Sequence, residues 1–351
     1  MQSFMKIQFS LILGYIAAAA SRILPECNGQ ARTRKNLRDM SRPEVNRYFN
    51  AIKRLNSGRK PTRWDMYAGI HREQYANIHG TPLFLVWHRM MLYSIEKDLQ
   101  KIDASVTIPY WDWTSFSQHP RSDPVFSQRL FGGIGNGRTG CVTTGAFTRF
   151  PVYFWHSGQE SIHCLTRRDD IFRRPFTSAT VIDHNYLDLT DIAEFGEAIE
   201  GVPHGTVHNN IGGEFSGHAS PGDPLFYSHH AFVDKLWFDW QNRHKANYSA
   251  YPLNGTEKLI PWNVPIEEVI DPVSSLCYKY PEDHFAYIKP HNSIKLINNA
   301  EFLGDAPSTD PTVKLPDPLP EKFISSMGFD VTRIREQERK DALVLAHLGP
   351  S

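Results

Sequence analysis

The residues best suited to chemistry in this sequence are its histidines, of which there are sixteen in 351 residues. At that frequency about one His-x3-His pair is expected by chance, so His204 and His208 alone carry little weight. Residues four apart on a helix nevertheless project to the same side, and a metal ion needs ligands that converge from rigid elements. The pair therefore offers two ligands of a metal site whose third ligand must come from another element.

The third candidate ligand is His230, in the segment SPGDPLFYSHHAFVDKLWFDWQ. A helix beginning near Pro224 would place Phe226, His230 and Asp234 on one face. We expect Asp234 to accept a hydrogen bond from a ring N–H, which would fix the tautomer of a metal-bound imidazole. His229 points about a quarter turn away, so we expect it to lie behind the ligands or simply to pack.

The N-terminal half offers a similar set in GIHREQYANIHGTPLFLVWHR, with His71, His79 and His88. Phe84 lies one helical turn before His88, just as Phe226 lies one turn before His230. Six neutral imidazoles suit copper or zinc better than calcium or magnesium, and three nitrogens per ion leave positions open for a substrate. A structural zinc protein remains an alternative to an enzyme.

The elements that must position these residues are mainly helices. Ser41 and Glu44 have capping-box spacing, and apolar residues recur at helical intervals in several segments. Residues 106–113 are expected to be extended, and 114–190 to form long loops with short strands. Helices are predicted over 41–56, 64–77, 82–102, 192–199, 204–210, 224–244 and 331–348. The predicted fold is mainly α, a four-helix bundle with a metal centre in its core.

Composition and the N-terminus indicate the kind of partner and the compartment. The 38 basic and 38 acidic residues balance, so neither nucleic acid nor a membrane is expected as a partner. Residues 1–20 have the pattern of a secretory signal peptide, which predicts a secreted, extracellular protein. The sequons at Asn247 and Asn254 would then be open to glycosylation, which makes a glycoprotein an expectation.

Four cysteines are consistent with an oxidising compartment and can pair in three ways. We favour Cys141 with Cys164, which would close a loop-like segment. The remaining pair, Cys27 with Cys277, would tie the start of the mature chain to its far end. The sequence alone leaves the connectivity open.

Two of these segments resemble motifs of a known family. HGTPLFLVWHR is similar to the first-copper motif, and DPLFYSHHAFVDKLWFDWQ to the second-copper motif, of the type-3 copper proteins: tyrosinase, catechol oxidase (together polyphenol oxidase) and haemocyanin. The resemblance, closest to short secreted fungal members, extends from about Arg34 through PYWDW to Tyr278 and Tyr280. It implies a four-helix bundle with two copper ions, one bound by His71, His79 and His88 and the other by His204, His208 and His230.

The resemblance also suggests roles near the metals. Glu200 matches the family glutamate that holds a water and can take a phenolic proton. Gly205 stands where members active on monophenols often have asparagine, and Asn209 instead follows the next ligand. At Asn77 many members carry a cysteine that forms a thioether, so none is expected here. Together these features favour a catechol oxidase, with Glu200 and Asn209 as its catalytic candidates.

The expected activity is oxidation of o-diphenols to o-quinones with reduction of O2 to water. A tyrosinase with monophenol hydroxylase activity and a haemocyanin-like O2 carrier are the alternatives. We expect a catalytic domain over 21–285 and an extension over 286–351 that packs on it without a separate shielding domain, which would leave the site accessible. The other histidines are taken as surface or packing residues, at positions 119, 156, 163, 184, 218, 244, 284, 291 and 347.

Overall fold

The computed structural model describes Leu24, Cys27 and residues 30–135, 139–154, 160–168, 174–282 and 313–348. The predicted signal peptide at 1–20 lies outside the described residues. The α-helices are α1 (Arg42–Leu55), α2 (Arg63–Ile78), α3 (Phe84–Ile102), α4 (Ala179–Val181), α5 (Ile192–Ile199), α6 (Gly205–Ile211), α7 (Leu225–Arg243), α8 (Glu267–Ile270), α9 (Glu321–Ser326) and α10 (Val331–Leu348).

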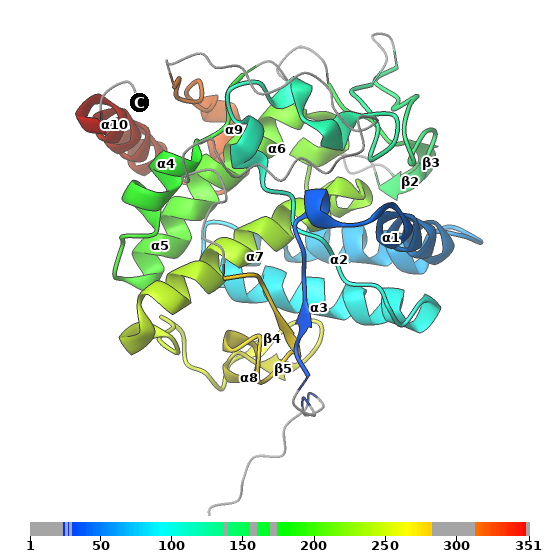
Figure 1. Ribbon diagram of the computed structural model, residues 1–351, viewed down its shortest axis with the longest axis horizontal. Coiled ribbons are helices and arrows are strands. Elements are labelled where there is room, and N and C mark those ends of the chain that lie inside the picture. Colours follow the sequence, from blue (N-terminus) through cyan, green and yellow to red (C-terminus); the bar gives the residue numbers. More distant parts are fainter. Residues whose placement is uncertain are drawn as a thin grey trace, which may run out of the picture.

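The mainly helical fold is confirmed, with a bundle formed by the helices that carry the histidines, α2, α3, α6 and α7 (Figure 1). Helices α2 and α7 both pack on α3, and α1 covers α3 from outside. Helix α3 is buried over most of its length, and its buried residues include the charged Arg89 and Glu96 as well as apolar side chains. The central position of α3 places histidines from both halves of the chain in one core.

Local capping fixes where the first two helices begin. Ser41 caps α1, where its backbone N–H donates to Glu44 Oε2 at 2.8 Å. Thr62 caps α2 in the same way, with its N–H 2.6 Å from Asp65 Oδ2. Such reciprocal caps satisfy donors that the first turn of a helix leaves unpaired.

The strands are short and pair in twos. β1 (Arg32–Thr33) is parallel to β6 (Tyr278–Lys279), whereas β2 (Pro151–Phe154) with β3 (Glu160–Cys164) and β4 (Lys258–Leu259) with β5 (Val264–Pro265) are antiparallel. The predicted extended segment 106–113 forms no strand in the described structure. Its main chain instead makes single contacts, such as Tyr110 N–H to Lys35 O at 2.9 Å.

Both favoured disulfides are confirmed. Cys27 is bonded to Cys277 beside β6, and Cys141 is bonded to Cys164 at the end of β3. In the described part of the chain, no helix is long and apolar enough to cross a bilayer.

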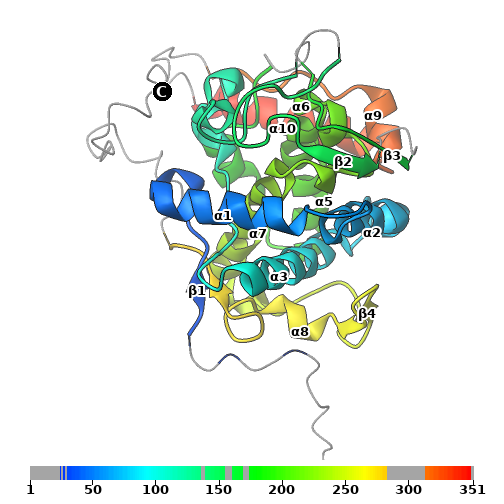
Figure 2. The same ribbon diagram turned by 90° about the vertical axis from the view of Figure 1, so that its right-hand side faces the viewer.

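The C-terminal residues 313–348 lie against the helical core (Figure 2). Helix α10 contacts the π-helical turns at Ile182–Tyr186 and Glu200–His204, and α9 packs on α10. An apolar cluster joins this segment to the core, with members Tyr75, Val202, Leu319, Phe323, Ile324, Met327 and Ile334. The tail is therefore part of the wall around the histidines.

Candidate metal centre

The first histidine group consists of His71 from α2, His79 at the end of α2 and His88 from α3. All three are buried, and one ring nitrogen of each lies within 4.8 Å of the others. The structure thus brings together the three N-terminal histidines singled out in the sequence.

Main-chain carbonyls orient two of these rings. His71 Nδ1 lies 2.6 Å from His218 O, and His88 Nδ1 lies 2.8 Å from Phe84 O. A carbonyl oxygen can only accept a hydrogen bond, so each Nδ1 carries the proton. The Nε2 atom of each ring therefore presents a lone pair to the centre of the group.

Glu200 orients the third ring and links the two groups. Its Oε1 lies 2.9 Å from His79 Nδ1 and accepts from Gly80 N–H at 3.0 Å, while its main-chain oxygen accepts from His204 Nδ1 at 2.9 Å. The side chain is only 2% exposed, and this burial raises the pKa of the carboxyl well above its ordinary range. One residue thus contacts a candidate ligand of each group.

The second group contains His204 and His208 around the start of α6 and His229 and His230 on α7. The helix predicted near 204–210 is a π-helical turn over Glu200–His204 that continues into α6. Such turns are rare and occur frequently at functional sites. His208 Nδ1 lies 2.5 Å from Phe215 O, so its Nε2 also presents a lone pair.

His229 lies closer to the second group than its place on the helix suggested. Its ring stacks on His204 with centroids 5.3 Å apart, and within the described residues neither of its nitrogens has a hydrogen-bond partner. The geometry alone therefore leaves His229 and His230 both within reach of the second group.

The arrangement of nitrogen atoms fits a pair of bound cations. Nε2 of His71 lies 3.1 Å from Nε2 of His79, and Nε2 of His208 lies 3.3 Å from that of His230. A cation between two such nitrogen atoms would take the place of the proton that otherwise has to join them.

Two further observations agree with a cation in each group. Nε2 of His88 and of His204 is buried without a hydrogen-bond partner among the described residues. Burial also lowers the pKa of His88 to about 3 and that of His208 to about 4, which keeps these rings neutral and able to bind metal. All the candidate donor atoms are imidazole nitrogens, and this set fits copper.

Two phenylalanines lie between the groups. The Phe84 ring centroid is 5.0 Å from that of His88 and 4.8 Å from that of His204. Phe226 is 5.4 Å from His71 and 4.1 Å from His230. Each phenylalanine therefore contacts rings of both groups.

A small cavity opens beside these residues. It has a volume of about 240 Å³ and is lined by Phe84, Glu200, Tyr251 and other residues from α3 and α5. A cavity of this size can hold a single aromatic ring but not a large ligand.

The surroundings of Gly205 differ from the accessible site expected from the short tail. A Cβ atom on Gly205 would lie 3.4 Å from Leu319 and 3.5 Å from Phe323. The tail covers this side because its apolar residues join the cluster around Tyr75. Asn209 is buried and donates to Asn210 Oδ1 at 3.2 Å, and no hydrogen bond joins it to Glu200 in the described structure.

Asp234 does not make the predicted hydrogen bond to His230. Its Oδ1 accepts from Arg89 at 2.6 Å, and its Oδ2 accepts from Tyr278 and Tyr280 at 2.6 and 2.7 Å. The side chain lies one turn beyond the ligand and is taken up by these buried donors. Asp234 therefore anchors α7 to α3 and β6 rather than orienting an imidazole.

Two backbone carbonyls that orient the rings, those of His218 and Phe215, were not among the predicted site groups. Every residue has a backbone carbonyl, so residue types do not show which carbonyls contact a histidine. The only sequence signal was the nearby glycines, which indicate a turn. Gly212 and Gly213 both have positive φ and reverse the chain after α6. His218 also stacks on Tyr75, with ring centroids 3.6 Å apart.

Known proteins resemble this chain in sequence and in fold. A family model described as the common central domain of tyrosinase matches residues 61–243. A tyrosinase from Streptomyces lincolnensis is 31% identical over 261 residues, covering 66% of this chain and 92% of the relative. Tyrosinase-like protein phomQ1 from Diaporthe leptostromiformis is 30% identical over 289 residues, covering 72% of this chain and 73% of the relative.

A solved structure shows the same fold. A mutant polyphenol oxidase from Thermothelomyces thermophila superimposes with a TM-score of 0.61 at 23% identity, covering 72% of this chain and 89% of that one. The bundle and its histidine groups thus lie in a fold shared with a polyphenol oxidase.

Proposed function

Since the chain belongs to the tyrosinase family of type-3 copper proteins, we propose that it oxidises o-diphenols to o-quinones while O2 is reduced to water. His71, His79 and His88 would hold one copper ion, and His204, His208 and His230 the other. We further propose that the protein is secreted after loss of residues 1–20, and its two disulfides fit such a compartment.

The observation that carries this proposal is the convergence of Nε2 lone pairs in two adjacent groups. The rings of His88 and His230 stack at 4.3 Å, so the groups face each other directly. A structural zinc site would be closed by four ligands, whereas the three nitrogens of the first group leave room for oxygen and substrate.

Bound copper would supply the electron transfer between the phenol and O2. The chain's own residues hold the imidazoles in place, keep water out and accept the substrate's proton. Glu200 suits the last task, because burial raises the pKa of its carboxyl and so makes its carboxylate a stronger base. Glu200 also lines the cavity, which supports this role.

Activity on diphenols rather than monophenols is the favoured specificity. Gly205 has no side chain to assist Glu200, and the Asn209 amide donates to Asn210. A catechol loses its first proton more readily than a tyrosine side chain does, so it requires less help from the protein.

The test is quinone formation in air by the copper-loaded protein, followed by absorbance with catechol and tyrosine in parallel. We expect catechol to react, tyrosine to react slowly or not at all, and the His208→Ala variant to be inactive. If neither phenol reacts with copper fully bound, the enzyme assignment is wrong. A fast reaction with tyrosine would instead support the tyrosinase alternative.

A haemocyanin-like O2 carrier is the second candidate, and the covered side of Gly205 favours it. Leu319 and Phe323 lie against the side of Gly205, the position that the family resemblance places near the substrate. Reversible O2 binding without oxidation of catechol would support the carrier, whereas turnover of catechol would exclude a role limited to O2 transport.

A further inference from the structure

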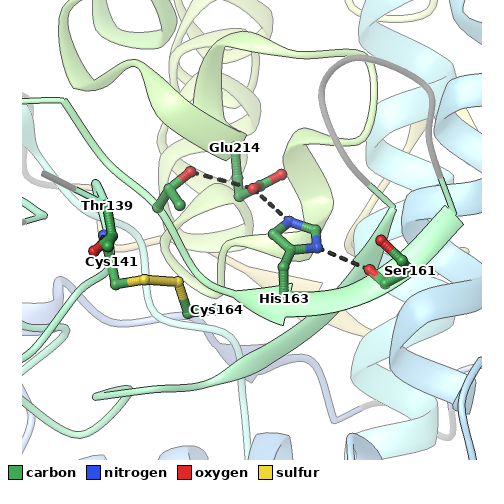
Figure 3. Close-up of a disulfide and its surroundings, with 7 residues drawn as sticks. Thr139, Cys141, Ser161, His163, Cys164 and Glu214 are labelled. Atoms are coloured by element: carbon green, nitrogen blue, oxygen red, sulfur yellow. Dashed lines mark hydrogen bonds and ion pairs between the residues drawn. A yellow bond between two sulfur atoms is a disulfide. The ribbon is translucent and has the colours of Figure 1, made fainter.

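A buried histidine and glutamate pair lies outside the two metal groups (Figure 3). His163 Nε2 is 2.7 Å from Glu214 Oε1, and their side chains are only 4% and 1% exposed. The other ring nitrogen, His163 Nδ1, is 3.0 Å from Ser161 O. Glu214 Oε1 also accepts from Thr166 Oγ1 at 3.2 Å.

A hydrogen bond joins the two side chains, which are nearly inaccessible to solvent. Ser161 O can only accept, so His163 Nδ1 carries a proton. The contact at Nε2 then requires a proton on either the ring or the carboxyl. Glu214 Oε2 is buried without a partner in the described part of the chain. Losing His163 would leave the buried Glu214 carboxyl with only the Thr166 hydroxyl at Oε1, and losing Glu214 would remove the contact at His163 Nε2, so either change is unfavourable.

Glu214 belongs to the short turn that orients a candidate ligand. The turn Gly213–Ser216 begins directly after Gly212. The φ values of 61° for Gly212 and 58° for Gly213 turn the chain back along α6. Phe215, the residue after Glu214, places its carbonyl oxygen 2.5 Å from His208 Nδ1. The position of the turn therefore decides how His208 presents its Nε2.

The other side of the pair is fixed to the β2–β3 hairpin. His163 lies in β3 directly before Cys164, whose disulfide to Cys141 is drawn in Figure 3. Glu214 N–H donates to Thr166 O at 3.1 Å, so the main chain and the side chain of Glu214 both bind this segment. The turn that holds His208 is thus attached to a covalently braced hairpin.

We propose that His163 and Glu214 are positioning residues for the second metal group. Through the Phe215 carbonyl they hold His208 in the tautomer and orientation that bind metal. This rests on the proposed ligand role of His208 and extends it to the turn that orients His208 and to the residue pair that holds the turn. His218, which orients His71, follows the same turn, where Gly217 N–H donates to Glu214 O at 3.1 Å, but its ring also stacks on Tyr75 of α2. We therefore expect the first group to depend less on the pair than the second.

The test measures binding of Co²⁺, whose visible absorption reports ligation without any turnover. Titrations are made in a His88→Ala background, in which only the second group is complete, and in a His208→Ala background, in which only the first is complete. Glu214→Leu is expected to weaken binding at the second group about tenfold or more, as loss of supporting hydrogen bonds around metal ligands does. At the first group the expected change is less than about threefold.

Conservative and neighbouring variants separate positioning from simple destabilisation. Glu214→Gln can still hydrogen-bond both His163 and Thr166, so it should restore affinity to within about twofold. Ile162→Ala, at an exposed position of the same strand, should change nothing. The double variant Glu214→Leu/His163→Leu leaves no unpaired buried charge, so it keeps the test open if the single variant does not fold.

The outcomes are distinct. Unchanged affinity at the second group in Glu214→Leu or the double variant overturns the inference, as does an equal loss at both groups. If the His88→Ala background itself binds no Co²⁺, His208 is not a ligand, and both the inference and the proposed function are wrong.

Discussion

Asp341 is expected to make the docking of α10 depend on pH. Its carboxylate accepts from Tyr186 Oη at 2.8 Å and from Gln337 Nε2 at 3.1 Å, and it also bonds Asn185. The side chain is 1% exposed, and burial raises its pKa from 3.8 to about 6. The perturbation is a change of pH across this range, compared with the Asp341→Asn variant.

The magnitude follows from the size of the shift. A pKa that is higher in the folded than in the unfolded chain adds stability at low pH, and that stability is lost as the pH rises through the folded value. The shift of about two units corresponds to about 3 kcal/mol, fully present below the unfolded pKa and absent above about pH 7. About half of this stability should be lost when the pH is raised from about 5 to about 7.5.

The assay is urea unfolding of the wild type and of Asp341→Asn at both pH values. The asparagine does not titrate, so the difference in unfolding free energy between the two proteins should change by about 1.5 kcal/mol, with the wild type relatively more stable at the lower pH. Other titrating groups are common to both proteins and cancel. A difference that stays constant with pH would refute the reasoning.

Three further predictions concern the site and its support. Glu200→Ala should weaken copper binding at the first group about 10- to 100-fold by releasing His79, and a chelator competition showing unchanged affinity would contradict this. Asp234→Ala should lower the free energy of unfolding by about 3–5 kcal/mol in urea, because the buried Arg89 loses its carboxylate partner and the buried Arg34 keeps only the carboxylate of Glu96. Copper affinity of this variant should stay within about twofold of the wild type. A large loss of affinity would contradict the conclusion that Asp234 does not orient His230. Phe323→Ala should raise kcat/KM for catechol about threefold or more, and an unchanged value would show that the tail does not limit access.

The helices and the candidate ligands were predictable from the sequence because both depend on local patterns. The capping residues Ser41 and Glu44 and the apolar periodicity located α1 within about one residue. His204 and His208 lie together in the structure for the same reason, since four residues form about one helical turn.

The features that the sequence did not reveal depend on contacts between distant segments. Asp234 lies one helical turn after His230, which is the spacing expected of a residue that hydrogen-bonds a metal ligand. Its carboxylate instead binds Arg89, which is 145 residues away in the sequence. Phe323 packs beside Gly205, and no local sequence pattern relates these two positions. The role of Glu214 likewise depends on β3 lying beside the turn after α6.

The most direct test of the central claim is the copper content of the purified protein and its variants after equilibrium dialysis. The account predicts two copper ions per chain in the wild type, one in His88→Ala, one in His208→Ala and none in the double variant. Copper that stays at full occupancy in either single variant, or a wild type that binds fewer than two ions, would contradict it.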